Sequence, residues 1–423
     1  MKTIKKMKVS SLLIGIFCFV SQVCMAQSSI GWRGENRDGI YHESGLLKIW
    51  AKEGPELLWL AEGIGKGYST PTVYGDKVFL TGLSEDGEQE VFSAYTLKGE
   101  KLYQVPFGSS WVASFPDSRS TPTIIGNKAY VTSGIGEVVC FNIADGKIIW
   151  SVDGKTKLQK LCGKWGTAES PLIVDNKVIY SPGGSQTTMV ALDAATGELI
   201  WQTESLSDTS SYTSPFLIRY KGKQQIVGFT TCSMYGVNPD NGEIQWTFAT
   251  WDFDTTGGMD GICSNTPLFK DGRLFVANAY DMNSFMFELN DDMTEVKLLW
   301  RNSDFSPHTG GMVLVDGIVY GTKFINNGSG EWVAIDWNSG TTRYKTPWEE
   351  KSKGSIIAAD NMLYCYDERR GTMALVNANP EKFDIVSEFR VPHGNGAHWA
   401  HPAIHDGILY VRHGDALMAY KVK

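Results

Sequence analysis

Short apolar runs alternate with turn residues along nearly the whole chain. One unit recurs: a Ser or Thr, a proline, three residues, a turn dipeptide of Gly, Asp or Asn, and then an apolar run, as in residues 120–131. Gly, Asn and Asp tolerate the positive φ angles of tight hairpins, and runs of Val, Ile, Leu, Phe and Tyr are typical of buried strands. The pattern therefore predicts a repeated β-hairpin.

The unit occurs eight times. Aligned on the proline, the copies fall at Pro71, Pro122, Pro171, Pro215, Pro267, Met312, Ile356 and Pro402, where the Met and Ile copies keep only the turn. A period of this length fits four short strands per unit, as in the blades of a propeller. We therefore predict an all-β fold, an eight-bladed β-propeller with an architecture like that of WD40 proteins.

The eighth unit holds only three strands, since the chain ends just after Leu417–Tyr420. The segment Glu56–Leu60 has the character of the missing outer strand, and its Trp59 lies where other units have an aromatic residue. Pairing of the N- and C-terminal strands would close the ring and remove both exposed edges. This predicts one propeller domain over residues 56–423, preceded by an N-terminal extension over residues 27–55.

Residues 1–26 have the pattern of a signal peptide. Four lysines precede a short apolar run at Leu12–Val20, and the segment ends in Cys24-Met25-Ala26. The apolar run is too short to span a bilayer, so it predicts cleavage near Ala26 and a periplasmic or secreted protein without a transmembrane segment. The alternative is a lipoprotein anchored through Cys24, although the residues before Cys24 make a poor lipobox.

Charge and cysteine content exclude several classes of protein. The formal net charge is −8, and loss of the four lysines in residues 1–26 makes it −12, which argues against a nucleic-acid partner because such proteins need a basic surface. Five cysteines remain after residue 26, an odd number without a CxxC motif, so no disulfide framework is expected. We expect a monomer.

A second motif follows the first by about 20 residues and carries a family resemblance. Its fullest copy, Ala191-Leu192-Asp193-Ala194-Ala195-Thr196-Gly197-Glu198-Leu199-Ile200-Trp201, resembles the tryptophan-docking motif of pyrroloquinoline-quinone (PQQ) enzyme propellers, in which the aromatic residue packs between blades. The stretch from Gly31-Trp32-Arg33-Gly34 to Arg37-Asp38-Gly39 also looks like the start of exported PQQ-like repeat proteins. The chain thus resembles the PQQ-like propeller family over nearly all of residues 27–423.

The resemblance implies three kinds of protein. These are the quinoprotein alcohol and sugar dehydrogenases, the propeller subunit of the outer-membrane β-barrel assembly machinery, which is a scaffold, and exported propellers without an established activity. The chain departs from the dehydrogenases because it has no adjacent Cys-Cys pair, no haem-attachment Cys-x-x-Cys-His and a shorter length. It departs from the assembly subunit because it lacks a convincing lipobox.

The residues just before each innermost strand are expected to surround one mouth of the central channel. They form an unusually polar set for equivalent positions, and ligand sites favour such mouths. The set consists of Tyr68, Arg119, Glu169, Tyr212, Asp260, Asn265, His308, Lys353, His398 and His401.

Two kinds of chemistry could use this funnel. For a PQQ-dependent enzyme, the resemblance implies Arg119 and Lys353 as a clamp for the quinone carboxylates, Glu169 and Asn265 as calcium ligands, and Asp260 as a general base. For a polysaccharide-processing propeller, His308 and His401, or His398, would serve as acid or base, with Arg119 neutralising an acidic sugar.

Aromatic loops and a histidine-rich C-terminal region complete the candidates. Trp111 and Trp251 lie in long loops before the second and fifth units and could stack on a ring-shaped ligand. The residues His393, His398, His401, His405 and His413 suggest a metal, but the intervening turn and strand predict different directions for them.

Together these features predict a propeller that binds a small molecule, a glycan or an envelope protein at its funnel, without proven catalysis. The alternatives are a PQQ- and calcium-dependent alcohol or sugar dehydrogenase and a polysaccharide-processing propeller. A purely structural interpretation of the polar residues at the mouth is that they hydrogen-bond to one another and bind water.

Overall fold

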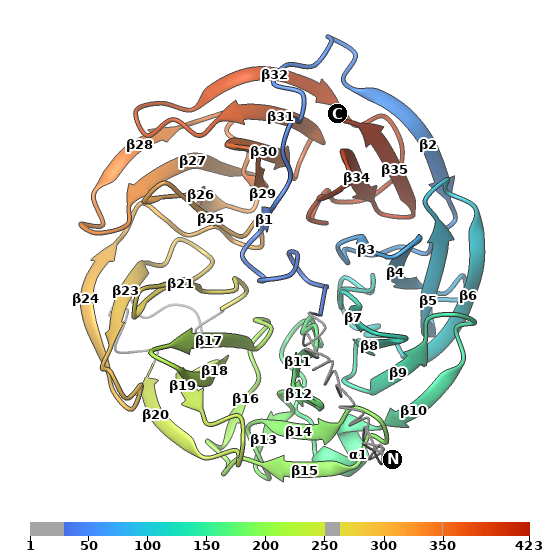
Figure 1. The fold of residues 1–423 in the computed structure, drawn as a ribbon, viewed down its shortest axis with the longest axis vertical. Helices are drawn as coiled ribbons and strands as arrows, with labels where there is room; N and C mark the ends of the chain where they lie inside the picture. Colours follow the sequence, from blue (N-terminus) through green and yellow to red (C-terminus); the bar gives the residue numbers. More distant parts are fainter. Residues whose placement is uncertain (1–28, 250–262, 349) are drawn as a thin grey trace, which may run out of the picture.

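The computed structural model describes residues 29–249, 263–348 and 350–423. Eight sheets surround a central axis like the blades of a propeller, seven of them four-stranded and one five-stranded (Figure 1). Within the described residues the only α-helix is α1 (Gly154–Leu158), and its N-cap Asp153 accepts hydrogen bonds from the backbone N–H groups of Lys155 and Thr156. The predicted all-β, eight-bladed propeller is confirmed.

Each blade runs outward from a short inner strand. Blade 1 consists of β3 (Thr72–Tyr74), β4 (Lys77–Leu83), β5 (Gln89–Thr96) and β6 (Lys101–Ser109), and blade 2 of β7 (Thr123–Ile125), β8 (Lys128–Thr132), β9 (Val138–Asn142) and β10 (Ile148–Val152). Blade 3 consists of β11 (Leu172–Val174), β12 (Lys177–Tyr180), β14 (Val190–Asp193) and β15 (Leu199–Gln202), and blade 4 of β17 (Phe216–Tyr220), β18 (Lys223–Phe229), β19 (Ser233–Val237) and β20 (Ile244–Ala249). The short strands β13 (Gly183–Gly184) and β16 (Asp208–Thr209) pair separately.

The second half of the ring repeats this order. Blade 5 consists of β21 (Leu268–Lys270), β22 (Arg273–Ala277), β23 (Ser284–Leu289) and β24 (Val296–Asn302), and blade 6 of β25 (Val313–Val315), β26 (Ile318–Asn326), β27 (Ser329–Asp336) and β28 (Thr342–Thr346). Blade 7 consists of β29 (Gly354–Ala359), β30 (Met362–Asp367), β31 (Thr372–Asn377) and β32 (Asp384–Arg390), joined at the centre by β1 (Ile40–Tyr41). Blade 8 consists of β33 (Ala403–His405), β34 (Ile408–His413), β35 (Ala416–Lys421) and β2 (Glu56–Glu62).

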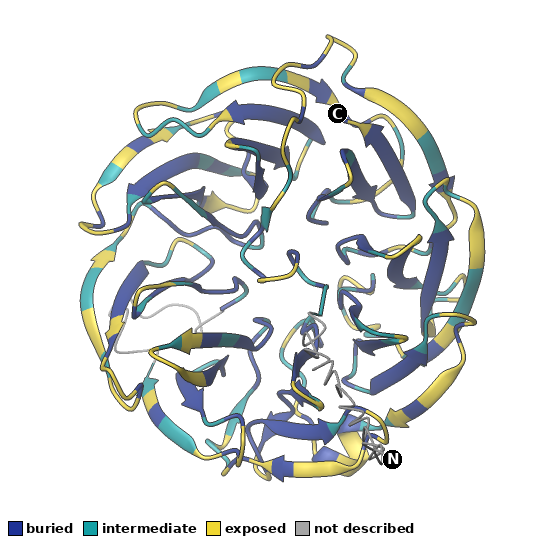
Figure 2. Ribbon diagram, in the orientation of Figure 1, coloured by how far each residue is buried: buried dark blue, intermediate teal, exposed yellow. Residues whose placement is uncertain are grey.

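Blade 8 closes the ring with strands from both ends of the sequence. The strand β2 pairs antiparallel with β35, in a register that places Glu56 opposite Lys421 and Leu60 opposite Met418. The predicted closure is therefore confirmed. Figure 2 shows the burial pattern: buried residues dominate the inner strands, whereas outer strands carry the exposed positions.

The third and outermost strands of every blade shift register by one residue. This β-bulge occurs in all eight blades. In blades other than the seventh, the residue that re-enters the register is an aromatic one: Tyr103, Trp150, Trp201, Trp246, Trp300, Tyr344 and Trp59. Bulges re-aim side chains, and here they direct a ring at the next blade.

Glycines of the next blade receive several of these rings. The indole of Trp150 in blade 2 donates to the Ala194 carbonyl of blade 3, at 3.3 Å, and its ring lies against Gly197. Trp59 contacts Leu97 and Gly99 in the same way, with an indole hydrogen bond of 2.8 Å to the Leu97 carbonyl. The turn glycine is thus required both for its backbone angle and for the space it leaves.

Substituting Gly197 tests this packing. Gly197 and Gly87 both have φ +77°, but a Cβ at Gly197 would lie 2.8 Å from the Trp150 ring, whereas a Cβ at Gly87 would meet nothing within 4 Å. We expect Gly87→Ala to cost about 1 kcal/mol through backbone strain alone, and Gly197→Ala to cost about 3 kcal/mol. Urea denaturation measures the difference, and equal losses would show that the Trp150 contact contributes nothing.

The channel segment, residues 30–41, fills the centre of the ring. Ile30 exchanges two backbone hydrogen bonds with Ile124 of blade 2, and β1 pairs parallel with β29 of blade 7. The Trp32 indole donates to Thr266 beside blade 5, at 2.9 Å. In Figure 1 this part of the chain crosses the middle of the ring. Part of the predicted N-terminal extension therefore lies where an open channel would otherwise run.

Two buried arginines hold the channel segment in place. Arg33 donates to the carbonyls of Met312 and Ile356, at 2.5 and 3.2 Å, and Arg37 donates to the carbonyls of Pro171 and Pro215. Burial lowers the pKa of each guanidinium to about 10, so both stay charged at neutral pH.

These acceptors are equivalent positions of the repeat. The carbonyls of Pro122, Pro171, Pro215, Met312, Ile356 and Pro402 all accept hydrogen bonds from side chains. The repeat therefore turns a ring of carbonyl oxygens toward the channel. A planar guanidinium with five donors suits such a ring better than an ammonium group does.

Candidate functional site

The connections between blades build the mouth at which we predicted a ligand site. The long connection before blade 2 brings Phe115 to Trp399 of the connection before blade 8, with ring centroids 5.6 Å apart, and Tyr68 lies on the other side of Trp399 at 5.0 Å. Phe115 is 52% exposed and the other two are partly exposed. These three rings form the first aromatic arc.

A second aromatic arc lies on blades 3 to 6. Trp165 contacts Tyr212 at 5.5 Å and stacks on Tyr280 at 5.9 Å, and Tyr280 meets the His308 ring edge-on at 4.9 Å. The charge of Arg119 acts on the hydroxyls of both Tyr68 and Tyr212, so this guanidinium lies between the two arcs. The mouth thus combines partly exposed rings with a cation, and we call the two arcs together the aromatic mouth.

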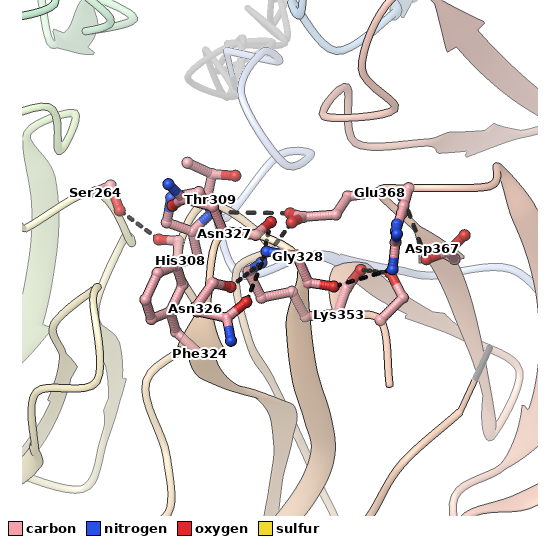
Figure 3. A network of polar contacts seen from close by, with 12 residues as sticks. Ser264, His308, Thr309, Phe324, Asn326, Asn327, Gly328, Lys353, Asp367 and Glu368 are labelled. Carbon is pink, nitrogen blue, oxygen red and sulfur yellow. Dashed lines mark hydrogen bonds and ion pairs between the residues drawn. The ribbon is translucent and has the colours of Figure 1, made fainter. Parts of the chain in front are cut away.

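A buried ion pair lies beside the second arc (Figure 3). The Lys353 ammonium is 2.6 Å from the Glu368 carboxylate, donates to the carbonyls of Asn326 and Asn327 at 3.1 and 3.4 Å, and lies over the Phe324 ring. Lys353 is 1% exposed, so its charge needs all of these partners. An ammonium with this coordination has no donor left for a ligand.

His308 shares Glu368 with Lys353. Its Nδ1 lies 3.7 Å from the Glu368 carboxylate and makes no hydrogen bond within the described residues. The backbone has φ +44°, a conformation unusual for a non-glycine residue, and Ser264 and Asn265 both donate to the His308 carbonyl. Among the predicted acid–base residues within the described ranges, His308 therefore retains an uncommitted ring nitrogen.

Glu169 lies deeper than the aromatic mouth. It is 1% exposed, and its carboxylate accepts from the backbone N–H of Ser181 at 3.0 and 3.3 Å. Burial raises its pKa, and the charges of Lys160 and Arg37 oppose this effect. Lys160, also buried, donates to the Ser181 carbonyl at 3.2 Å and to the Ser210 hydroxyl at 2.5 Å. Glu169 is thus one member of an internal polar cluster.

The other predicted quinone and calcium ligands are also engaged internally. Asn265 uses its amide N–H on the His308 carbonyl and its oxygen on the Gly311 N–H, each at 3.0 Å. Arg119 donates to the carbonyls of Ser114 and Phe115 in its own loop. The Lys353 ammonium is thus fully engaged, Arg119 uses one of its nitrogens, and the Glu169 and Asn265 oxygens already accept backbone N–H groups. Lys353 therefore has no donor left for a quinone carboxylate.

The remaining predicted residues divide into three groups. His401 accepts from Arg33 on Nδ1 at 2.7 Å and contacts the Thr309 carbonyl through Nε2 at 2.9 Å, and burial lowers its pKa to about 3. Trp111 is half-buried with its ring against Gly166. Trp251 and Asp260 lie outside the described residues. The catalytic and cofactor roles themselves stay predictions.

Sequence reasoning missed three residues of this region. Glu90, on β5, is 2% exposed, accepts from the Ser118 hydroxyl at 2.5 Å, and has its pKa raised by burial to about 7. Lys160 and Glu368 lie in loops away from the repeat motif. A charged residue next to the apolar run Val91-Phe92 was a signal for Glu90, whereas no periodic pattern marks Lys160 or Glu368.

A cavity lies at the opposite mouth of the ring from the one at which we predicted a ligand site. Its volume is about 1250 Å³, and its walls are the hairpin turns of blades 2 and 3 and the inner strands of blades 2 to 5. Glu35, Arg37 and Asp38 of the channel segment also line it. Part of the channel segment therefore forms one wall of this cavity.

Among the described residues, no cluster of three or more His, Cys, Asp or Glu has the arrangement of a metal site. No helix within those same ranges is long and apolar enough to cross a bilayer. The five described cysteines, Cys140, Cys162, Cys232, Cys263 and Cys365, are free thiols.

The fold and the repeats define the class of protein: an eight-bladed propeller of PQQ-like repeats. A family model described as "Outer membrane protein assembly factor BamB" matches residues 87–327, which is more than half of the chain. The chain belongs to this family.

Individual relatives agree with the assignment. Outer membrane protein assembly factor BamB of Kangiella koreensis is 27% identical over 131 residues, which span 30% of this chain and 30% of that protein. The crystal structure of BamB from Moraxella catarrhalis superposes with a TM-score of 0.62 and 15% identity, over 87% of this chain and 99% of that one. The quinohemoprotein alcohol dehydrogenase ADHIIG from Pseudomonas putida HK5 has a TM-score of 0.69 and 13% identity, over 94% and 80% of the two chains. The two structural matches show the fold alone.

Proposed function

We propose that this protein is a non-catalytic binding propeller of the cell envelope, which takes a protein partner at the aromatic mouth. The observation that carries the proposal is the contrast within that mouth: Lys353, Glu169 and Asn265 are consumed by internal contacts, whereas the rings of Phe115, Trp399 and Trp165 remain partly exposed. Exposed aromatic side chains around a polar centre are typical of binding surfaces.

The family and the N-terminus support the kind of partner. The name of the family describes an assembly factor for outer membrane proteins, and the export pattern of residues 1–26 would bring this chain to the same compartment. Unfolded outer membrane strands alternate apolar and polar residues and are rich in aromatic residues at their ends. We propose that such an extended segment is what the aromatic mouth binds.

Peptide binding tests the proposal. A fluorescently labelled synthetic peptide with the alternating pattern of an outer membrane strand is titrated with the purified protein, and anisotropy gives the Kd. We expect Phe115→Ala and Trp399→Ala each to weaken binding about tenfold, because central aromatic side chains dominate interface energies. Leu102→Ala is the matched control: Leu102 is 47% exposed on the outer strand β6, away from the mouth.

Two results would contradict the proposal. One is equal affinity of the parent and the two mouth variants. The other is a calcium-dependent rise in Tm on titration with PQQ, together with dye reduction in the presence of alcohols or sugars, which would favour the dehydrogenase alternative. Binding of the protein to glycans on an array, without binding to the peptides, would favour the polysaccharide alternative.

A further inference from the structure

A small pocket between blades 7 and 8 has a composition unlike the rest of this acidic chain. Its volume is about 360 Å³. Two guanidinium groups and three imidazoles line it, and the described lining residues include no Asp or Glu: the charged or titratable members are Arg370, Arg390, His393, His398 and His413. Two guanidinium groups beside hydrogen-bonding imidazoles, with no carboxylate in the lining and in a chain of net charge −8, indicate a place for an anion.

The backbone fixes the two arginines at the edge of the pocket. Arg370 lies in the turn between β30 and β31, where the buried Asp367 carboxylate accepts from the backbone N–H groups of Arg370 and Gly371. Arg390 ends β32, and its Nε donates to the Arg370 carbonyl at 3.1 Å. The terminal nitrogens of Arg390 have no partner among the described residues, whereas one nitrogen of Arg370 pairs with the exposed Glu350.

The histidines form the inner wall. The rings of His398 and His413 stack with centroids 3.6 Å apart. His413 is held by two carbonyls, since its Nδ1 lies 2.8 Å from the His393 oxygen and its Nε2 lies 3.0 Å from the Gly396 oxygen. Both nitrogens of His413 are therefore committed, which removes it as a metal ligand.

His398 also lines the pocket. It is 7% exposed, and its Nδ1 lies 2.5 Å from the Tyr366 hydroxyl. That hydroxyl has no other acceptor among the described residues, so it donates to Nδ1 and the ring proton lies on Nε2. The Nε2–H has no hydrogen-bond partner within the described ranges, and burial, His413 and Arg390 lower the pKa of the ring to about 3, which keeps it neutral.

We propose that this pocket binds the tetrahedral oxyanion of a phosphate or sulfate group. The free donors come from a turn, a strand end and a loop, so they approach from several sides. A phosphoryl group presents three strong acceptor oxygens in different directions and matches this arrangement, whereas the two oxygens of a carboxylate lie in one plane. The pocket is distinct from the aromatic mouth, because none of its lining residues belongs to either aromatic arc.

Thermal unfolding with inorganic phosphate tests the proposal. At constant ionic strength, phosphate and sulfate are expected to raise the Tm of the full protein in a saturable manner, and acetate is not. Arg390→Gln should raise the apparent Kd for phosphate at least about tenfold, because it removes the unpaired guanidinium. Arg301→Gln is the matched control, since Arg301 is an exposed arginine near the end of β24, the corresponding outer strand of blade 5.

Further arms separate the possible sources of the phosphate. A rise in Tm with glycerol 3-phosphate would indicate a small soluble ester, whereas sedimentation with phosphatidylglycerol vesicles would indicate a lipid headgroup. Loss of the Tm rise or of the sedimentation in Arg390→Gln supports the site. Circular dichroism checks that the variant is folded, and Arg370→Gln provides a second substitution. The proposal is overturned if phosphate leaves the Tm unchanged, if Arg390→Gln responds like the parent, or if only Zn²⁺ or Ni²⁺ binds.

Discussion

Replacing Arg33 with methionine is expected to lower the free energy of unfolding by about 3 kcal/mol. The substitution leaves the carbonyls of Met312 and Ile356 and the Nδ1 of His401 without their donor, and hydrogen bonds to a charged group are each worth about 1.5–3 kcal/mol, part of which entering water restores. Urea denaturation followed by circular dichroism measures the loss.

The local consequence is a second readout. Because β1 is attached to blade 7 next to Arg33, the amides of Ile40 and Tyr41 should exchange with solvent faster in the variant than in the parent. Arg301→Met, at an exposed outer-strand position, should stay within about 0.5 kcal/mol of the parent. A similar small effect in Arg33→Met would mean that the channel segment is held by its backbone pairing alone.

Raising the pH from 4.5 to 9 is expected to remove about 3 kcal/mol of stability through Glu90 alone. Its pKa has an ordinary value near 4.5 in the unfolded chain, and burial raises it to about 7 in the fold. Between these values the folded protein holds the extra proton, so the contribution of Glu90 is complete below pH 4.5 and is lost as the pH rises through 7.

The substitution Glu90→Gln isolates this effect. An amide keeps the shape and the donor of the protonated carboxyl group, so the variant should match the parent near pH 5 and exceed its stability at pH 8. Glu88→Gln is the control, because Glu88 is exposed two residues away and should not alter the pH profile. Parallel profiles of Glu90→Gln and the parent would show that the Glu90 carboxyl ionises without cost in the fold.

The sequence predicted the ring because its determinants are local and repeated. A proline, a turn dipeptide and a docking aromatic recur in register, and the partial eighth unit matched the strand at Glu56–Leu60. The channel segment was not predicted as such. Through backbone carbonyls Arg33 joins blades 6 and 7 and Arg37 joins blades 3 and 4, and such acceptors leave no mark on the residue types that carry them.

The sequence indicated which residues lie at the mouth, but not which hydrogen bonds and ion pairs they make. Tyr68, Arg119 and His308 do lie at the mouth, because their place before an inner strand is set by the repeat. Two other predicted residues, Lys353 and Glu169, are bound by residues of other loops. Glu368 pairs with Lys353, and the backbone N–H of Ser181 donates to Glu169. A pattern of residue types along one strand cannot show which of its polar groups a distant loop will satisfy.

The pairing of β2 with β35 has a consequence for biosynthesis. The strand β2 leaves the ribosome hundreds of residues before its partner β35. Arg33 likewise leaves it long before His401 of blade 8, to which it donates a hydrogen bond. Until then the nascent chain presents an unpaired edge, and its longest-range contacts close last. The protein therefore cannot complete its fold until blade 8 has been synthesised, and a holding chaperone would have most to protect just before that blade emerges.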